Sequence, residues 1–396
     1  MNKGIRLRTL VTGFLLALVC FVLGYYLSPA IQPALAPPQN LQFTNDEWQL
    51  FDEVNAKIRD EFLEKNVSTS TLMNGVLGGM VGSLGDPYSQ YLDPSSYTDW
   101  TSEISGTYGG IGMELGSKDD RPTVISVFPD TPAEVAGIRS GDHFVKVGET
   151  MVEGLTITQI AQKVKGPVGT EVILLMERSG EILTFTLTRA QITVQSVSGK
   201  MLEGGVGMIR LLGFKEQTAD DFGRTLEQLS RQGMQKLLLD LRQNPGGLLS
   251  SVIDVASYLV PANQSIVILE DRDGNKRISH STPFTPKFQL PMVVLIDGGT
   301  ASAAEILAGA LRDHQLATLV GERSFGKGIV QTSFQLSQGS ALVLTTARYL
   351  TPSGESIHKK GISPDIEVIP TAQDITDGKD PVFERGLSTL LGAATP

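Results

Sequence analysis

The chain has 396 residues, enough for two or three domains, and 41% of them are apolar, which is sufficient for a globular core. Its formal net charge of −10 argues against a nucleic-acid-binding protein, because such a protein needs a basic surface. The four histidines include no pair at a helical metal-ligand spacing, and the single cysteine, Cys20, lies in an apolar N-terminal segment. We therefore expect no metal site, no nucleic-acid partner, no disulfide and no cysteine nucleophile.

The N-terminal segment is typical of an exported protein. Lys3, Arg6 and Arg8 precede a run of 19 uncharged residues, 9–27, which spans most of a membrane at about 1.5 Å per residue. Basic residues before such a run place the rest of the chain outside the cytoplasm. The sequence "ALA" at 34–36 resembles a signal-peptidase site, so residues 1–36 are either a cleaved signal peptide or a membrane anchor with a linker.

Residues 40–105 are expected to form a helical N-terminal region. Apolar residues recur at helical spacing between Leu50 and Phe62, which predicts helix from Thr44 to about Leu84. The stretch "GDPYSQYLDPSSY" at 85–97 then predicts a loop with tight turns and aromatic anchors.

Between residues 106 and 190 short strands are predicted at 123–128, 142–148, 171–178 and 182–189. One helix interrupts them, and its apolar face comprises Ile157, Ile160 and Val164. The turn before the first of these strands comprises Gly109, Gly110, Ile111 and Gly112. Together these features resemble a PDZ domain, in which such a turn holds a peptide carboxylate and the peptide adds as a strand beside the helix. A small β-domain without a ligand is the alternative.

Strands and helices alternate from residue 191 onward, which predicts a mixed α/β domain over residues 191–370. The expected strands lie at 205–214, 236–242, 291–297, 316–322 and 341–349. Helices are expected after Thr218, after the "NPGG" turn at 244–247, and around residues 302–311. Residues 371–396 are expected to form a C-terminal tail, in which "PVFERGLSTLLG" at 381–392 is a candidate helix.

The stretch "DGGTASAAEILAGAL" at 297–311 runs from a strand through a glycine turn into a helix, and it places Ser302 at the first turn of that helix. A helix N-terminus supplies free N–H groups and a partial positive charge, which suit an oxyanion. A serine hydroxyl needs a base, and the candidate is Lys327. The glycines on either side of it let the backbone bend inward, and burial would lower its pKa from about 10.4. Gln331 shares a face with Lys327 if that segment is helical, and its amide would orient the amine without adding charge. Singly, each of the three residues is also consistent with a purely structural role.

Four stretches, "GGTASAAEILAGAL", "FGKGIVQ", "LDLRQNPGG" and "GDPYSQYLDP", resemble the carboxy-terminal processing peptidases, also called tail-specific proteases. The resemblance covers roughly residues 45–370, including the order of the domains. It implies an α/β and β multidomain protein: a mixed α/β serine-protease core with an inserted PDZ domain and a helical N-terminal region. By match of motif it implies Ser302 as the nucleophile, Lys327 as the general base and Gln331 as its orienting partner. The oxyanion hole that it implies comprises Gly246, Gly247 and Ala303.

One position departs from the family pattern. Members often carry an arginine before the glycine that ends the PDZ helix, and this arginine has been proposed to link the domain to the active site. The present chain has Lys165 there. A lysine ammonium does not reproduce a bidentate arginine contact, so the linkage is in doubt for this chain.

The function that follows is a serine endopeptidase without a cofactor, which binds the free C-terminus of exported polypeptides and cleaves nearby. We expect it in the periplasm or at the cell exterior, anchored by the N-terminal segment or secreted, and the flanking helices would serve a homodimer. Two alternatives stay open. One is a catalytically silent PDZ adaptor on a protease scaffold, and the other is a hydratase-like enzyme that uses a glycine oxyanion site on acyl-CoA.

Overall fold

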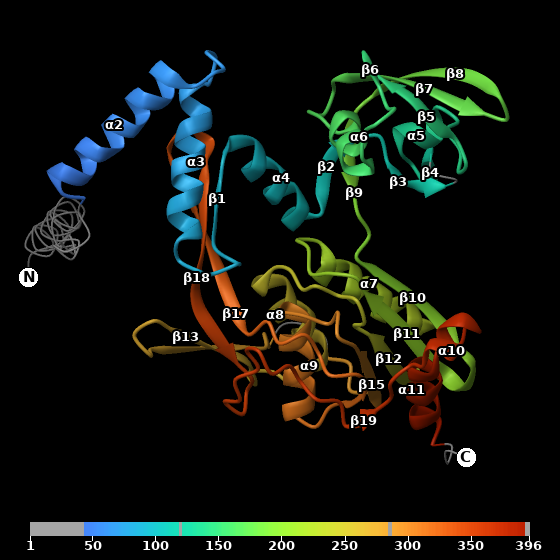
Figure 1. The fold of residues 1–396 in the computed structure, drawn as a ribbon. Coiled ribbons are helices and arrows are strands. Elements are labelled where there is room, and N and C mark those ends of the chain that lie inside the picture. The colour runs from blue at the N-terminus through green and yellow to red at the C-terminus, as the bar shows by residue number, and fades with distance from the viewer. Residues whose placement is uncertain (1–42, 119–120, 284–286, 393–396) are drawn as a thin grey trace, which may run out of the picture. The chain divides into compact units, whose positions relative to one another are not determined.

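The computed structural model describes residues 43–118, 121–283 and 287–392 (Figure 1). The predicted signal peptide or anchor, residues 1–36, lies outside these ranges. Within them, no helix combines the length and the apolar character needed to cross a membrane. The chain divides into two compact units, residues 1–73 and 74–396.

The described part of the first unit is helical. Its helix α2 (Asn45–Glu61) begins at a capping box, in which the Thr44 hydroxyl accepts from the N–H of Glu47 at 3.3 Å and the Glu47 carboxylate accepts from the N–H of Thr44 at 2.7 Å. No side chain of α2 is buried, and Trp48 is 53% exposed. The apolar side chains of α2 are therefore exposed on its surface.

The single helix predicted over residues 44–84 is in fact two helices. The first ends where Phe62 adopts an extended backbone, and α3 (Thr69–Gly82) follows after a short connection. The Ser68 hydroxyl accepts from the N–H of Thr71 at 3.0 Å and so caps the start of α3. Local capping thus interrupts a pattern whose apolar spacing alone suggested continuity.

A small β-domain is inserted between two strands that pair antiparallel, β2 (Thr107–Gly110) and β9 (Ala190–Thr193). Its sheet has the order β3-β4-β5-β7-β8, with β6 paired to β5. These strands are β3 (Met113–Lys118), β4 (Arg121–Val127), β5 (His143–Val147), β6 (Thr150–Met151), β7 (Glu171–Arg178) and β8 (Glu181–Thr188). Its helices are α5 (Pro132–Val135) and α6 (Ile157–Val164). Alternate residues of β7, such as Val172 and Leu174, face one apolar core.

The larger domain is built on a six-stranded sheet with the order β10-β11-β12-β15-β16-β19. The first two strands are antiparallel, and every later neighbour is parallel. The strands are β10 (Val197–Leu202), β11 (Val206–Leu211), β12 (Lys236–Asp240), β15 (Met292–Ile296), β16 (Thr318–Gly321) and β19 (Ile366–Glu367). The central strands are continuous apolar runs because helices cover both faces of the sheet.

Four helices pack on this sheet: α7 (Thr218–Arg231), α8 (Leu249–Leu259), α9 (Ala303–Asp313) and α11 (Pro381–Leu391). Leu237 and Leu239 of β12 share a core with α7, α8 and α9, whereas Leu238 shares a second core with α11. The short α10 (Ala372–Thr376) precedes α11. The candidate helix at 381–392 is therefore confirmed as α11, and it belongs to the packed domain.

A second sheet of this domain has the order β1-β18-β13-β14, and β17 also pairs with β18. Its strands are β1 (Gln90–Leu92), β13 (Ser265–Asp271), β14 (Lys276–His280), β17 (Ile329–Gln335) and β18 (Ala341–Leu350). Short 3-10 turns lie at η2 (Glu203–Gly205) and η3 (Ser337–Gly339). The predicted loop at 85–97 is only partly a loop, since it contains β1 and the start of α4 (Pro94–Ser105).

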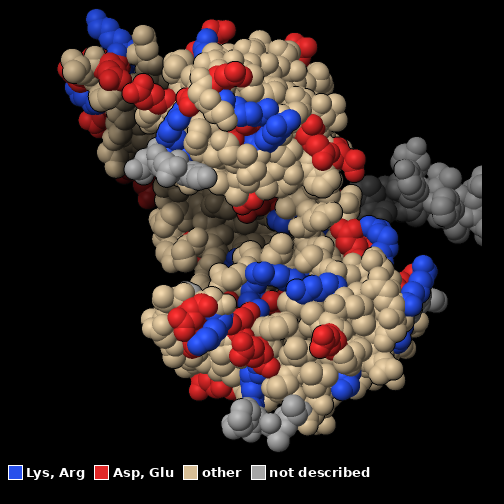
Figure 2. Space-filling model, turned by 90° about the vertical axis from the view of Figure 1, so that its right-hand side faces the viewer, with Lys and Arg blue, Asp and Glu red and all other residues tan. Residues whose placement is uncertain are grey.

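Charged side chains are spread over the face that Figure 2 shows. Lys and Arg side chains are interspersed there with Asp and Glu side chains, although the chain as a whole carries a net charge of −10. The surface in this view is therefore of mixed sign.

Candidate active site

Three neighbouring strands of the larger sheet end at the same edge, and each leads into a segment with predicted site residues. β12, β15 and β16 are parallel neighbours. The carboxyl ends of parallel strands meet at one edge of a sheet, so the loops that follow them converge. The "NPGG" turn follows β12, the segment with Ser302 follows β15, and the segment with Lys327 follows β16.

The residues predicted for the nucleophile, the base, its partner and the oxyanion hole all line one cleft of about 1050 Å³. They are Ser302, Lys327, Gln331, Gly246, Gly247 and Ala303. Apolar walls of the cleft include Leu249, Leu269, Ile306 and Ile329. Apolar walls around a few convergent polar groups are typical of a binding or active site. Within the described part of the chain, no cluster of three or more His, Cys, Asp and Glu side chains is arranged to hold a metal ion.

Ser302 occupies the N-cap position of α9 with a strained backbone. Its φ of 54° and ψ of −117° lie in a region that residues with a side chain rarely adopt. Such strain persists only where the surroundings hold it. Tyr349 helps to hold this conformation: it is buried, and its hydroxyl donates a hydrogen bond to the carbonyl oxygen of Ser302 at 2.9 Å.

Glu305 is buried in the first turn of α9 and holds the backbones of Ser302 and Lys327. Its carboxylate accepts from the N–H of Ser302 and from the N–H of Lys327, each at 2.9 Å. It also accepts from the Ser324 hydroxyl at 2.6 Å and from the N–H of Gly326 at 2.8 Å. Hydrogen bonds to an ionised carboxylate are strong, so Glu305 fixes one segment against the other. Glu305 is not among the site residues predicted from the sequence, although Ser-x-x-Glu at a helix start is a capping pattern.

Lys327 is half-buried, and its ammonium lies over an aromatic ring. Nζ is 4.9 Å from the centroid of the Tyr88 ring. Burial lowers the pKa of Lys327, and the charge of Asp86 opposes this shift without cancelling it. The lowered pKa is the direction that a lysine base requires. Among the described residues, Nζ forms no hydrogen bond with Ser302 or Gln331.

Gln331 lies on strand β17 and not on a helix. β17 pairs antiparallel with β18, and the register shifts between Val330 and Gln331. Such a bulge redirects the side chains that follow it. The segment is therefore not the helix on which Lys327 and Gln331 would share a face, because its pairing with β18 outweighs any local helical tendency. The Gln331 side chain still lines the cleft, and its buried Nε2 has no hydrogen-bond partner within the described ranges.

The glycine turn after β12 comes so close to Ser302 that side chains are excluded from it. Gly246 has a φ of 101°, and a Cβ at this position would lie 2.8 Å from the Cβ of Ser302. Gly247 has a φ of 145°, and a Cβ there would lie 2.2 Å from the carbonyl oxygen of Phe214. Only glycine tolerates both the dihedral angles and the contacts.

The predicted oxyanion donors differ in whether their N–H groups are already hydrogen-bonded within the protein. The N–H of Gly246 donates to Oδ1 of Asn244 at 2.9 Å. The N–H groups of Gly247 and Ala303 have no partner in the part of the chain that the structure describes. Gly247 and Ala303 are thus the free donors of the predicted set, while Gly246 shapes the turn.

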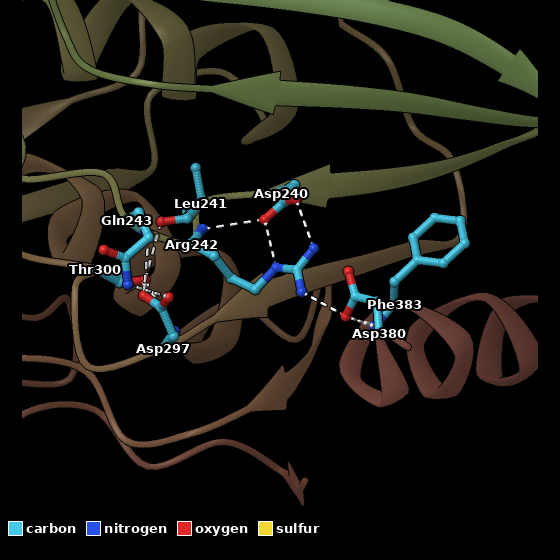
Figure 3. Close-up of polar contacts among 8 residues, drawn as sticks. All are labelled: Asp240, Leu241, Arg242, Gln243, Asp297, Thr300, Asp380 and Phe383. Carbon is cyan, nitrogen blue, oxygen red and sulfur yellow. Dashed lines mark hydrogen bonds and ion pairs between the residues drawn. The ribbon is translucent and has the colours of Figure 1, made fainter. Parts of the chain in front are cut away.

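Hydrogen bonds join the turn after β12 to the turn after β15 (Figure 3). Asp297 accepts from the N–H of Gln243 at 3.0 Å and from its Nε2 at 2.7 Å. The Thr300 hydroxyl donates to the carbonyl oxygen of Leu241 at 2.9 Å. These bonds set the glycine turn at a fixed position beside the segment that carries Ser302.

Arg242 connects the same turn to the C-terminal helix (Figure 3). It donates to the buried Asp240 at 2.9 Å and to Asp380 at 2.7 Å. Asp380 in turn caps α11 by accepting from the N–H of Phe383 at 3.0 Å. Burial opposes the charge of Arg242, but its bonds to the two carboxylates outweigh that effect and raise its pKa.

The peptide-binding residues predicted in the small β-domain lie on the two expected elements. Gly109 and Gly110 belong to β2, and Gly112, with a φ of 82°, directly precedes β3. Ile157 is half-buried at the start of α6. Three of the predicted apolar side chains are buried in the core of the domain: Ile111, Ile160 and Val164. The turn would therefore contact a ligand through its backbone and not through Ile111.

Lys165 directly follows α6, and its ammonium lies over the ring of Tyr108 on β2. Its Nζ is 4.8 Å from the centroid of the Tyr108 ring, which belongs to β2. Burial raises the pKa of Tyr108. Lys165 is not among the residues that line the cleft with Ser302.

Three protein-family models match the chain. "Peptidase family S41" matches residues 205–368, which include Ser302 and Lys327. "PDZ domain" matches residues 123–178 within the small β-domain. "Activating protease CtpB N-terminal domain" matches residues 33–96.

Individual relatives agree with these matches. The carboxy-terminal processing protease CtpB of Bacillus subtilis is 35% identical over 341 residues, which cover 84% of this chain and 71% of the relative. The carboxy-terminal-processing protease of Bartonella bacilliformis is 35% identical over 359 residues, covering 88% and 82%. The solved structure of a photosystem II D1 C-terminal processing protease is 30% identical, with a TM-score of 0.50 and coverage of 86% and 90%.

The fold and these matches define a serine peptidase with a PDZ domain, and they confirm the predicted fold class. The chain belongs to the carboxy-terminal processing peptidases of peptidase family S41. Peptidase and PDZ domains both act on polypeptides, so a peptide is the partner that this family membership supports.

Proposed function

We propose that the protein is an exported endopeptidase in which Ser302 is the nucleophile, Lys327 is the general base and Gln331 orients the lysine. The N–H groups of Gly247 and Ala303 bind the oxyanion, and Gly246 gives the turn its shape. The enzyme binds the free C-terminus of a polypeptide on its PDZ domain and cleaves the same chain nearby.

In this mechanism the neutral amine of Lys327 takes the hydroxyl proton of Ser302 while the oxygen attacks the scissile carbonyl carbon. Each N–H group that binds the resulting oxyanion contributes roughly 2.7–4 kcal/mol. The Lys327 ammonium then gives its proton to the leaving amine, and the acyl group stays on Ser302 as an ester. A water molecule, deprotonated by the lysine, hydrolyses this ester and restores the enzyme.

The observation that carries the proposal is the shared carboxylate of Glu305. Its hydrogen bonds to the N–H groups of Ser302 and Lys327 hold a strained serine and a half-buried lysine at one cleft. The lowered pKa of Lys327 supports the role of a base. Catalytic hydrogen bonds often tighten only when substrate is bound, which accounts for the missing bond between Lys327 and Ser302.

Recognition of a C-terminus rests on the turn before β3. Backbone N–H groups of a glycine-rich turn bind a carboxylate through charge-assisted hydrogen bonds, which are stronger than those to an amide oxygen. The positive φ of Gly112 allows the turn, and Gly109 and Gly110 fix it to β9. The peptide then extends from α6 toward the cleft.

Export, anchoring and dimer formation belong to the same proposal. Residues 1–36 would export the chain or anchor it in a membrane, and the remaining divisions are a helical region at 40–105, the PDZ domain at 106–190, the core at 191–370 and the tail at 371–396. The exposed apolar side chains of α2, among them Trp48 and Leu50, support a homodimer. Sedimentation of residues 37–396 tests this, and a Trp48→Glu variant should be monomeric.

The proposal is tested with one peptide in two forms, a free C-terminal acid and its amide. Amidation removes the terminal charge and leaves the scissile bond unchanged, so the amide should be cleaved several-fold more slowly at low substrate concentration. Equal kcat/KM values for the two forms would contradict recognition of the C-terminus, whatever the nucleophile is.

A domain replacement gives the matched control. Gly110 and Ala190 pair directly across β2 and β9, so a short turn in place of residues 111–189 preserves this hairpin. The replaced enzyme should cleave both peptide forms at one common rate. A preference for the free acid that survives the replacement would place recognition outside the PDZ domain.

A further inference from the structure

The stretch Asp86–Ser89, which the sequence singles out as a loop, contacts the candidate base. The half-buried Tyr88 lines the same cleft as Ser302, and its ring faces the ammonium of Lys327 at 4.9 Å from centroid to Nζ. A cation within about 6 Å of an aromatic face is attracted by the quadrupole of the ring. Tyr88 thus provides a specific contact for the only charged atom of Lys327.

The loop that carries Tyr88 is itself held in place. The Asp86 carboxylate accepts from the N–H of Tyr88 at 3.1 Å and from the Ser89 hydroxyl at 2.6 Å. The Ser89 oxygen accepts from the N–H of Thr345 on β18 at 3.0 Å. β1, which follows directly, pairs with the same strand β18 (Figure 1). The position of the ring is therefore fixed by the sheet and is not set by a free loop.

Several residues with charged or titratable side chains lie next to the Gly326–Gly328 segment, those after β18 through their main chain. The loop contributes Asp86 and Tyr88, α9 contributes Glu305, β18 contributes Tyr349, and the segment after β18 contributes His358, Lys359 and Lys360. Of these, Asp86 is the group whose charge acts on the pKa of Lys327, and it favours the ammonium. The Tyr88 ring also favours the ammonium, because a neutral amine gains little from the quadrupole.

We infer that Tyr88 is a positioning residue for Lys327, whose ring face holds the lysine side chain at the cleft beside Ser302. The inference deepens the proposed function, because it rests on Lys327 as the base. Its consequence is twofold. The ring directs the amine, and it keeps the resting lysine protonated to a higher pH than burial alone would allow.

The direct test is titration of Lys327 in the protein without the predicted signal peptide or anchor, residues 37–396, with lysines labelled by reductive ¹³C-methylation. The Lys327→Arg variant identifies the resonance by its loss. Removing the ring in Tyr88→Leu should lower the pKa of Lys327 by about half a unit. Tyr88→Phe keeps the ring and should leave the pKa unchanged, and Tyr88→Trp offers a stronger ring and should raise it.

Enzyme kinetics provide a second readout. In Tyr88→Leu the acid limb of the kcat profile should move to lower pH, and the plateau at high pH should fall about threefold to tenfold because the amine is less well directed. Tyr88→Phe should restore both values. A merely structural role would lower the rate at every pH without moving the limb.

The results that would overturn the inference are an unmoved Lys327 titration in both Tyr88→Leu and Tyr88→Trp, or equal shifts in Tyr88→Leu and Tyr88→Phe. If Tyr88→Leu does not fold, the comparison of Tyr88→Phe with Tyr88→Trp decides. The titration does not depend on the catalytic role of Lys327. An active Lys327→Ala variant would therefore contradict the proposed function, while the titration would still decide the role of Tyr88.

Discussion

At the scale of single residues, one buried carboxylate holds two backbone segments, those of Ser302 and Lys327, at a fixed distance from each other. Glu305 receives hydrogen bonds from Ser302, Ser324, Gly326 and Lys327. A glutamine has the same shape but only one accepting oxygen, so its amide would face N–H groups and leave donors unsatisfied. The precision of the site is therefore expected to depend on the charge of Glu305 and not only on its volume.

Glu305→Gln should lower the free energy of unfolding by about 1–3 kcal/mol, because buried N–H groups lose their acceptor. It should also lower kcat by roughly tenfold or more, since a small misplacement of catalytic groups is costly. Urea denaturation and initial rates measure the two effects, and Glu181→Gln on the exposed part of β8 is the control. A variant with unchanged stability and unchanged kcat would show that Glu305 does not hold the site.

The pH dependence follows from the direction of the Lys327 shift. Burial lowers the pKa of Lys327 below its ordinary value, so the fraction of neutral amine, and with it kcat/KM, should rise with pH through that lowered value. Asp86→Asn removes the charge that favours the ammonium and should move the rising limb to lower pH. A rate that stays constant from pH 6 to 9, with chemistry rate-limiting, would count against a lysine base.

Some site residues are visible in the sequence because their chemistry is local. Ser302 follows a glycine turn at a helix start, and Lys327 stands between two glycines. Tyr349 and Tyr88 act through partners on distant segments, and no local pattern reveals such contacts. Glu305 stands in a local capping pattern, but that pattern does not reveal its bonds to Ser324, Gly326 and Lys327. The neighbours of Lys327 become evident only when β18 brings the loop at 86–89 beside the cleft.

At the scale of elements, the long apolar strands were predictable and the pairing-dependent strands were not. β12 and β15 are continuous apolar runs of a covered sheet, so their sequences suffice. β17 has a mixed pattern, "IVQTSFQ", and it is a strand because it pairs with β18 along its whole length. β13 and β14 form an antiparallel pair of the second sheet that the predicted elements did not include.

The ion pair between Asp240 and Arg242 is predicted to stabilise the turn after β12 more than the link from Arg242 to Asp380 at the C-terminal helix. Arg242→Met removes the ion-pair partner of Asp240, whose buried carboxylate is 1% exposed, and should cost about 3–5 kcal/mol of unfolding free energy. Asp380→Asn retains an N-cap and leaves the inner pair intact, so it should cost less than about 1 kcal/mol. Chemical denaturation compares the two variants, and equal losses would contradict a special role of the inner pair.

At the scale of the whole molecule, the PDZ domain and the peptidase core have separate apolar cores. The core of the small β-domain and the cores that cover the six-stranded sheet share no residues. The chain with residues 111–189 replaced by a short turn should therefore still unfold cooperatively, as followed by circular dichroism. Loss of a cooperative transition would show that the peptidase core depends on the PDZ domain for its stability.

The measurement that tests the account most directly is the cleavage rate of one peptide substrate by wild-type protein and by Ser302→Ala. Ser230→Ala, at an exposed position of α7, is the matched control. If Ser302 is the nucleophile, its alanine variant should lose on the order of 10⁴-fold or more in kcat while the melting temperature and peptide affinity stay close to those of the wild type. Turnover by folded Ser302→Ala within tenfold of the wild-type rate would contradict the account, because the Ser302 hydroxyl could then not be the nucleophile.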